Sequence, residues 1–132
     1  MKTNFDLKGK TALITGASSG LGEQFARTLA AAGARVILAS RRIEKLKALQ
    51  EELGNARALQ MDVADKSSVA RGFEALESSG ERIDIGVNNA GIAARTPIFE
   101  ADEEEKFESI IQTNLMGVWY VTQQLAYHMK DH

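Results

Sequence analysis

The chain has 132 residues, of which 44% are hydrophobic and 26% charged, with a net charge of −2 and no cysteine. Since domains run to roughly 100–200 residues, a single globular domain over residues 1–132 is predicted. The absence of cysteine excludes disulfides, and no metal site is expected. The small negative net charge does not favour a protein that binds nucleic acid or a membrane surface. No apolar run reaches the roughly 20 residues that span a bilayer and no apolar signal segment follows Met1, so a cytoplasmic protein is expected.

Short apolar runs alternate with segments of helical periodicity along the chain. Strands are predicted at four apolar runs, residues 11–15, 36–39, 58–61 and 83–87. Gly86 weakens the last of these strands and is expected to leave packing volume unfilled. Helices are predicted where apolar residues recur every three or four positions, at residues 21–29, 43–53 and 69–76, each followed by a glycine.

A longer helix is predicted in the last third of the chain. Asp102 and Glu105 have the spacing of a capping box, and apolar residues then recur at helical spacing from Phe107 to Leu125. The acidic residues 100–105 are interpreted as complementing the positive end of this helix rather than as a partner-binding tail. The whole alternation predicts right-handed βαβ units, and therefore an α/β fold with a parallel sheet covered on both faces.

A glycine-rich loop, residues 15–22, joins the first strand to the first helix with the sequence Thr-Gly-Ala-Ser-Ser-Gly-Leu-Gly. Such glycines permit a tight turn and close backbone approach to a ligand, and the N–H groups that open the helix would face a pyrophosphate. No lysine follows as a triphosphate-binding loop requires, and Phe25 breaks the spacing of the usual dinucleotide fingerprint. Taken alone, the loop is equally consistent with a simple turn.

Polar residues follow the other three strands as well. Ser40, Arg41 and Arg42 follow the second strand, where they suit a 2′-phosphate on an adenosine ribose, or else form a helix start with two solvated arginines. Asp62 follows the third strand, where its carboxylate would accept a hydrogen bond from the adenine amino group or cap the next helix. Residues 88–91, Asn-Asn-Ala-Gly, follow the fourth. Because the carboxyl ends of parallel strands share one edge, the set favours a dinucleotide site over a flavodoxin-like or receiver domain.

These motifs, together with Asn114, resemble the amino-terminal half of the short-chain dehydrogenase/reductase family from about Leu7 onward. The resemblance implies a Rossmann-like, partially doubly wound fold with strand order 3-2-1-4. It also implies a nicotinamide cofactor, and hydride exchange between the hydroxyl of an alcohol and the carbonyl of a ketone. The expected substrate is a small carbonyl or alcohol.

The resemblance further implies a role for each matching residue. The implied pyrophosphate and adenosine contacts are Gly16, Ser18, Ser19, Gly20, Leu21 and Gly22. Ser40 and Arg41 would hold the 2′-phosphate, with Arg42 a second candidate, so NADP is expected in preference to NAD. The implied adenine and inner contacts are Asp62, Val63, Asn89, Ala90 and Gly91. Asn114 matches the family's catalytic asparagine, where a helix irregularity lets its carbonyl hold a proton-relay water; a hydrogen-bonded buried amide is the alternative.

The family's acid–base pair, a tyrosine followed four residues later by lysine, has no counterpart in this chain. Tyr120 is followed at that spacing by Gln124, and Tyr127 by Asp131. The chain is therefore expected to be truncated relative to the family and inactive by itself, because an unassisted tyrosine is a poor proton donor at neutral pH. The alternative function is a non-catalytic nucleotide-binding or self-associating module.

Self-association is expected because two apolar surfaces would lie open. The fourth strand would form a sheet edge with unpaired backbone groups, and the apolar side of the long helix, including Trp119, would lack a cover. A homo-oligomer is therefore predicted. His128 and His132 are interpreted as surface residues with no catalytic role.

Overall fold

A four-stranded parallel sheet forms the middle layer of the protein, in a computed structural model that describes residues 5–94, 98–99 and 104–131. Its strands are β1 (Thr11–Thr15), β2 (Arg35–Ser40), β3 (Ala56–Gln60) and β4 (Ile85–Val87). They lie in the order β3-β2-β1-β4, and every neighbouring pair is parallel. The expected Rossmann-like α/β fold with strand order 3-2-1-4 is confirmed.

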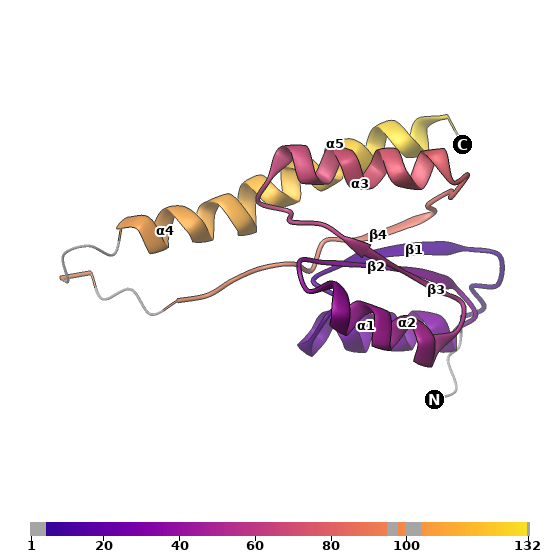
Figure 1. Ribbon diagram of the computed structural model, residues 1–132. Helices are drawn as coiled ribbons and strands as arrows, with labels where there is room; N and C mark the ends of the chain where they lie inside the picture. The colour runs from indigo at the N-terminus through magenta and orange to yellow at the C-terminus, as the bar shows by residue number, and fades with distance from the viewer. Residues whose placement is uncertain (1–4, 95–97, 100–103, 132) are drawn as a thin grey trace.

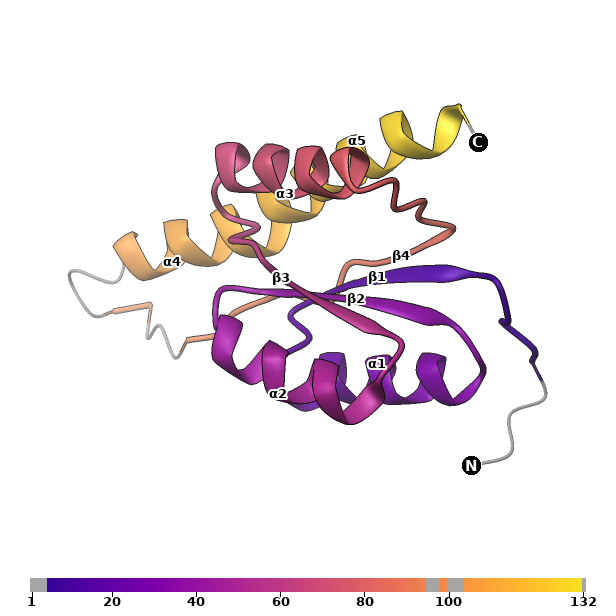
Figure 2. The same cartoon turned by 45° about the vertical axis from the view of Figure 1, so that its right-hand side comes forward.

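Helices cover both faces of this sheet, as Figure 1 and Figure 2 show. One face carries α1 (Gly20–Ala31) and α2 (Ile43–Leu53), and the other carries α3 (Lys66–Ser78) and α5 (Gly117–Lys130). The helix α4 (Glu104–Ile111) reaches beyond the sheet and continues through a π-helical turn, η1 (Gln112–Met116), into α5. Among the described helices, none is long and apolar enough to cross a membrane.

The central strands are buried on both faces, which explains why their sequences are continuously apolar. Along β1, Leu13 joins the core under α3 and α5 and Ile14 joins the core under α1 and α2, because alternate residues of a strand face opposite directions. Phe73 of α3 and Val121 of α5 belong to the first core, and Leu46 of α2 belongs to the second. These two cores hold the sheet between the helices, and the carboxyl ends of the strands lie outside them.

Three strands have other bounds than expected, and of these β2 is one residue longer at each end than the predicted residues 36–39. β3 begins at Ala56 and ends at Gln60, rather than spanning residues 58–61, and β4 begins at Ile85 rather than at residue 83. Just before β4, the backbone N–H of Ile83 donates to the imidazole Nε2 of His128, at 3.0 Å. The hydrogen bond comes from a helix more than forty residues away, which a local pattern does not reveal.

His128 is a buried residue, so its interpretation as a surface side chain was wrong. It is only 5% exposed. Its ring meets Phe73 edge to face, with centroids 6.3 Å apart, and its Nδ1 lies 3.6 Å from a carboxylate oxygen of Glu77. Because Nε2 accepts the N–H of Ile83, the neutral ring carries its proton on Nδ1, on the side of Glu77. The imidazole thus joins α5, α3 and the start of β4. His132 lies outside the described residues.

The apolar stripe predicted for the long helix is only half right. Leu125 is buried, but Phe107 and Leu115 are 58% and 62% exposed. The buried residues of α5 follow a different helical spacing from the predicted one, at Gly117, Val121, Leu125 and His128. α4 also lies beyond the sheet that would bury its apolar residues (Figure 1). The predicted capping residue, Asp102, lies outside the described residues.

Gly86 leaves no unfilled volume, contrary to the expectation. A Cβ built on Gly86 would overlap the Cδ1 of Leu125, so the leucine side chain already occupies that space. The missing side chain lets α5 pack directly on the backbone of β4. The glycine that weakens the strand therefore serves the contact between strand and helix.

Candidate functional site

A pocket of about 330 Å³ lies at the carboxyl ends of the four strands. Its lining residues are Gly16, Ser18, Ser19, Leu21, Ser40, Arg41, Arg42, Met61, Asp62, Val63, Asn89, Ala90, Gly91, Ile92 and Thr113. Every strand end therefore contributes, as expected for the ligand edge of an open α/β sheet. The volume falls at the lower end of the range for small-molecule sites.

Most of the predicted site residues meet in this pocket. Gly20, Gly22 and Asn114 are the predicted residues that do not line it. Three lining residues were missed by sequence reasoning, Met61, Ile92 and Thr113. Each directly adjoins a predicted residue in the sequence, so that adjacency was the only signal that could have found them.

The glycine loop is shaped by close backbone contacts. Gly16 has φ +64, and a Cβ there would lie 2.8 Å from the Cα of Ala90. A Cβ on Gly22 would overlap the carbonyl oxygen of Gly16. Asn89 closes this contact, because its Nδ2 donates to the carbonyls of Thr15 at 3.2 Å and Gly16 at 3.3 Å. The loop thus forms a backbone cradle that only residues without a side chain allow.

Thr15 braces the cradle from below. Its buried hydroxyl accepts from the backbone N–H groups of Asn89 and Ala90, both at 3.0 Å, and donates to the carbonyl of Val87 at 3.4 Å. A hydroxyl can make these three bonds at once. The ends of β1 and β4, more than seventy residues apart in sequence, are therefore locked together beside the pocket.

The residues after β2 form the cationic wall of the pocket. Arg41 is exposed, and its backbone carbonyl accepts from the side chain of Gln60 at 3.2 Å. Arg42 reaches back to the glycine loop, where its Nη2 donates to Ser18 Oγ and to Ser19 Oγ, each at 2.9 Å. The buried hydroxyl of Ser40 accepts the backbone N–H of Arg42 at 3.1 Å. The loops after β1 and β2 are thus joined through one arginine.

Asp62 stays at the pocket and does not cap α3, which rules out the capping alternative. The helix is capped by Asp65, whose Oδ1 accepts from Ser67 N at 2.9 Å and Ser68 N at 3.3 Å. Asp62 instead folds its own loop, because its Oδ1 accepts from Ala64 N at 3.0 Å. Its backbone N–H donates to the hydroxyl of Ser68 at 2.9 Å. The carboxylate is therefore held in position beside Val63.

Asn114 lies in the middle of the π-helical turn and is hydrogen-bonded but not buried. Its Oδ1 accepts from Ile92 N and its Nδ2 donates to Ile92 O, each at 2.8 Å. The wall formed by Ile92 and Thr113 is thereby fixed to the helix. A π-helical turn is the kind of irregularity that the resemblance implies at this position.

Charge is distributed unevenly between the pocket and the rest of the protein. The hydrogen bond from Arg35 lowers the pKa of Glu81, and the hydrogen bond from Arg27 lowers the pKa of Glu52. In the part of the chain that the structure describes, neither Arg41 nor Arg42 has a carboxylate within ion-pair distance. No group of three or more His, Asp or Glu side chains in that part is arranged to hold a metal ion. The pocket wall therefore keeps two positive charges.

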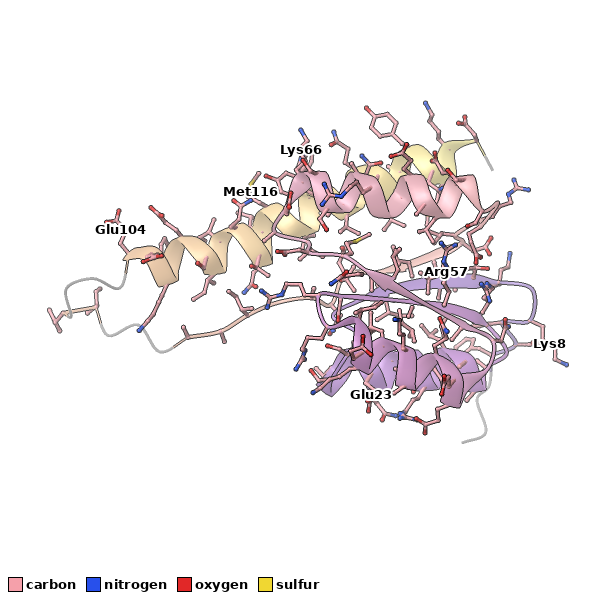
Figure 3. The ribbon with its side chains drawn as sticks, viewed as in Figure 1. Lys8, Glu23, Arg57, Lys66, Glu104 and Met116 are labelled. Carbon is pink, nitrogen blue, oxygen red and sulfur yellow. The ribbon has the colours of Figure 1, made fainter. Side chains whose placement is uncertain are left out.

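Figure 3 places two labelled residues in the two helical layers around this site. Met116 of η1 lies in the layer on one side of the sheet, and Glu23 of α1 lies in the layer on the other side. The pocket lies between these two layers at the strand ends. Leu21 of α1 and Arg41 in the loop after β2 line it on one side, and Thr113 of η1 lines it on the other.

Known proteins are similar to this chain in sequence and in fold. The model for short chain dehydrogenase matches residues 10–132. Gluconate 5-dehydrogenase of Gluconobacter oxydans (strain 621H) is 39% identical over 129 residues, which cover 95% of this chain and 50% of that protein. The chain spans about half the length of the curated relatives it matches.

Two solved structures resemble the fold closely. The 3-ketoacyl-(acyl-carrier-protein) reductase from Brucella melitensis, complexed with NADH, has a TM-score of 0.87 and 38% identity, covering 96% of this chain and 52% of that one. The gluconate 5-dehydrogenase from Burkholderia cenocepacia J2315, in complex with NADP and tartrate, has a TM-score of 0.84 and 37% identity, covering 95% of this chain and 50% of that one.

Proposed function

The chain belongs to the short chain dehydrogenase family, and on that premise we propose that it forms the NADP(H)-binding part of an oxidoreductase that moves hydride between an alcohol and a ketone. One observation carries the proposal: the glycine loop, the arginines after β2, Asp62 and the loop after β4 all line one pocket. These features lie far apart in sequence, so their meeting in a single pocket supports a common ligand.

The residues around the glycine loop fit a pyrophosphate. Ser19 is the N-cap of α1 but makes no side-chain capping bond, so it leaves the first backbone N–H groups of the helix to another acceptor. Those groups and the helix dipole attract anions. The cradle at Gly16 and Gly22 brings the backbone close to such a ligand. We assign the pyrophosphate to this position.

The residues after β2 and β3 fit the adenosine end. The carboxylate of Asp62, which lies beside Val63, would accept a hydrogen bond from the adenine amino group. Ser40, Arg41 and Arg42 would surround the 2′-phosphate, since guanidinium groups bind phosphate through paired hydrogen bonds. The two similar structures hold NADH and NADP respectively, so the preference for NADP rests on these arginines.

The residues after β4 fit the nicotinamide end. Asn89, Ala90 and Gly91 line the inner pocket, and the hydrogen bonds of Asn114 fix its far wall. A bound NADP(H) would supply the hydride chemistry. We assign to Asn114 the main-chain carbonyl that holds a proton-relay water, because a π-helical turn frees a carbonyl from the regular helix pattern.

Calorimetric titration with NADPH and with NADH tests this function. Tighter binding of NADPH is expected, and Arg41→Asp should reverse or abolish the preference because a carboxylate repels the 2′-phosphate. Lys47→Asp, which makes the same charge change on the exposed surface of α2, is the control and should leave the preference intact. Failure of the wild-type chain to bind either dinucleotide would contradict the proposal.

A second candidate function, self-association, is favoured by a specific surface. Phe107, Leu115 and Trp119 along α4, η1 and α5 are 58%, 62% and 60% exposed. In the described sheet, β4 also lies at an edge. Exposed apolar surface of this kind marks association surfaces. Sedimentation at micromolar concentration should show a species larger than one chain; a clean monomer would contradict this candidate.

A further inference from the structure

Arg42 is held by three serine hydroxyls from two loops. Its Nη2 donates to Ser18 Oγ and Ser19 Oγ, each at 2.9 Å, across 24 and 23 residues of sequence. Its backbone N–H donates to Ser40 Oγ at 3.1 Å. Both ends of the residue are therefore fixed before any ligand arrives.

The partners of Arg42 differ in charge from those of the protein's structural arginines. Arg27 donates to Glu52 at 2.7 Å and Arg35 donates to Glu81, so a carboxylate compensates each of these guanidinium groups. The hydroxyls on Arg42 are neutral. In the described part of the chain, Nη1 and Nε of Arg42 have no hydrogen-bond partner, so three of its five N–H donors stay available. This arrangement orients a cation without neutralising it.

The side chain of Ser19 does not cap helix α1, although serine at this position usually does. It is the N-cap of α1, in the extended conformation with φ −164, yet its side chain accepts no hydrogen bond from the helix. A serine N-cap ordinarily accepts from the second or third N–H of the helix. Here the hydroxyl is turned to Arg42 instead. The capping bond is therefore replaced by a bond that orients a side chain of the pocket.

We propose that Ser18 and Ser19 are positioning residues for cofactor choice, which they exert by holding the guanidinium of Arg42 against the pocket. This inference rests on the proposed function, since the group selected is the extra phosphate of NADP(H). The two hydroxyls fix a long side chain that would otherwise lose rotamer freedom on binding, so the phosphate meets a preorganised cation. Arg42 thereby becomes a principal phosphate contact rather than a secondary one.

The affinities of NADPH and NADH for four chains test this inference: the wild type, Ser18→Ala/Ser19→Ala, Arg42→Ala and the triple variant. The ratio of the two affinities should fall roughly tenfold in Arg42→Ala, the loss of one strong phosphate contact. The double serine variant should lower the ratio by most of the same factor. The triple variant should lower it no further than Arg42→Ala does, because the serines act through the arginine.

The remaining outcomes separate the inference from the function beneath it. An unchanged ratio in the double serine variant would overturn the inference, and so would a further fall in the Arg42→Ala background, which would mean that the hydroxyls touch the phosphate themselves. An equal loss of NADPH and NADH affinity would assign the serines to the pyrophosphate and also overturn it. A wild-type chain that binds neither dinucleotide would instead refute the proposed function.

A conservative variant guards against a purely structural effect. Ser19→Thr keeps the hydroxyl at an exposed position and should retain the wild-type ratio, whereas Ser19→Ala should lower it. Equal ratios for these two variants would count against the role of Ser19. Circular dichroism of each variant identifies any chain that has lost its fold.

Discussion

The side-chain amide of Asn114 exchanges two hydrogen bonds of 2.8 Å with the backbone of Ile92, 22 residues away. The amide bonds both the N–H and the carbonyl of Ile92, as the backbone of a neighbouring strand would. The segment after β4 is therefore held in place although it belongs to no strand. The bonds place Ile92 and Thr113 at the pocket wall. The position of this wall therefore depends on one side chain in the π-helical turn.

Replacement of Asn114 by alanine should destabilise the protein. Both bonds are lost, and at about 0.5–1.5 kcal/mol each the expected cost is about 1–3 kcal/mol. Urea unfolding measures it, and hydrogen exchange should accelerate at the backbone N–H of Ile92. Gln24→Ala removes an amide with a single 3.5 Å bond on the surface of α1 and serves as the control, with an expected change within about 0.5 kcal/mol. Equal stabilities of the two variants would show that the pair contributes nothing.

Replacement of His128 by phenylalanine should isolate the worth of its hydrogen bond. The variant keeps a ring against Phe73 but leaves the N–H of Ile83 without its acceptor. A buried donor left without a partner costs about 1–3 kcal/mol, so the free energy of unfolding should fall by that amount. Tyr127→Phe, one position earlier on the exposed side of α5, should change it by less than about 0.5 kcal/mol. A His128→Phe chain as stable as this control would contradict the assignment.

Acid should weaken the cluster around Glu81. The hydrogen bond from Arg35, opposed by burial and aided by Arg57, lowers the pKa of Glu81 below its ordinary value of 4.5. A carboxyl whose pKa is lower in the folded state stabilises the fold above the unfolded-state value, and this stabilisation disappears as the pH falls through the folded-state value. The difference in unfolding free energy between wild type and Glu81→Gln should therefore be full at neutral pH and shrink below about pH 4.5.

A second variant tests the cause of that pH dependence. In an Arg35→Gln background, the Glu81→Gln substitution should show much less pH dependence, because the largest cause of the lowered pKa is gone. An unchanged pH profile in this background would mean that Arg35 is not the source. Denaturant unfolding at a series of pH values provides the measurement.

The 132-residue chain should bind cofactor without turning it over. Neither tyrosine is followed four residues later by lysine, since Gln124 and Asp131 stand there. Loss of a positioned proton donor removes a factor of about 10²–10⁴ in rate. NADPH oxidation with a panel of ketones should therefore stay near the background rate, and robust turnover would contradict this expectation.

The sheet and most of the pocket residues can be predicted from the amino-acid sequence alone. The buried strands β1 and β2 must be continuously apolar, so residues 11–15 and 36–39 are recognisable without any partner. The parallel alternation then brings the strand ends to one edge, which is why the glycine loop, Arg41, Asp62 and residues 89–91 were found together. These features depend on local pattern and on connectivity, and both can be read along the chain.

Contacts between side chains that are distant in the sequence could not be predicted and are seen only in the folded chain. Leu125 fills the space above Gly86, His128 accepts a bond from Ile83 45 residues away, and Ser19 turns from its helix to Arg42. A serine at a helix start or a histidine near a chain end has the same local pattern whether its partner is backbone, water or a distant residue. The partner of each side chain depends on packing, because the two hydrophobic cores fix how far the helices lie from the sheet and from one another.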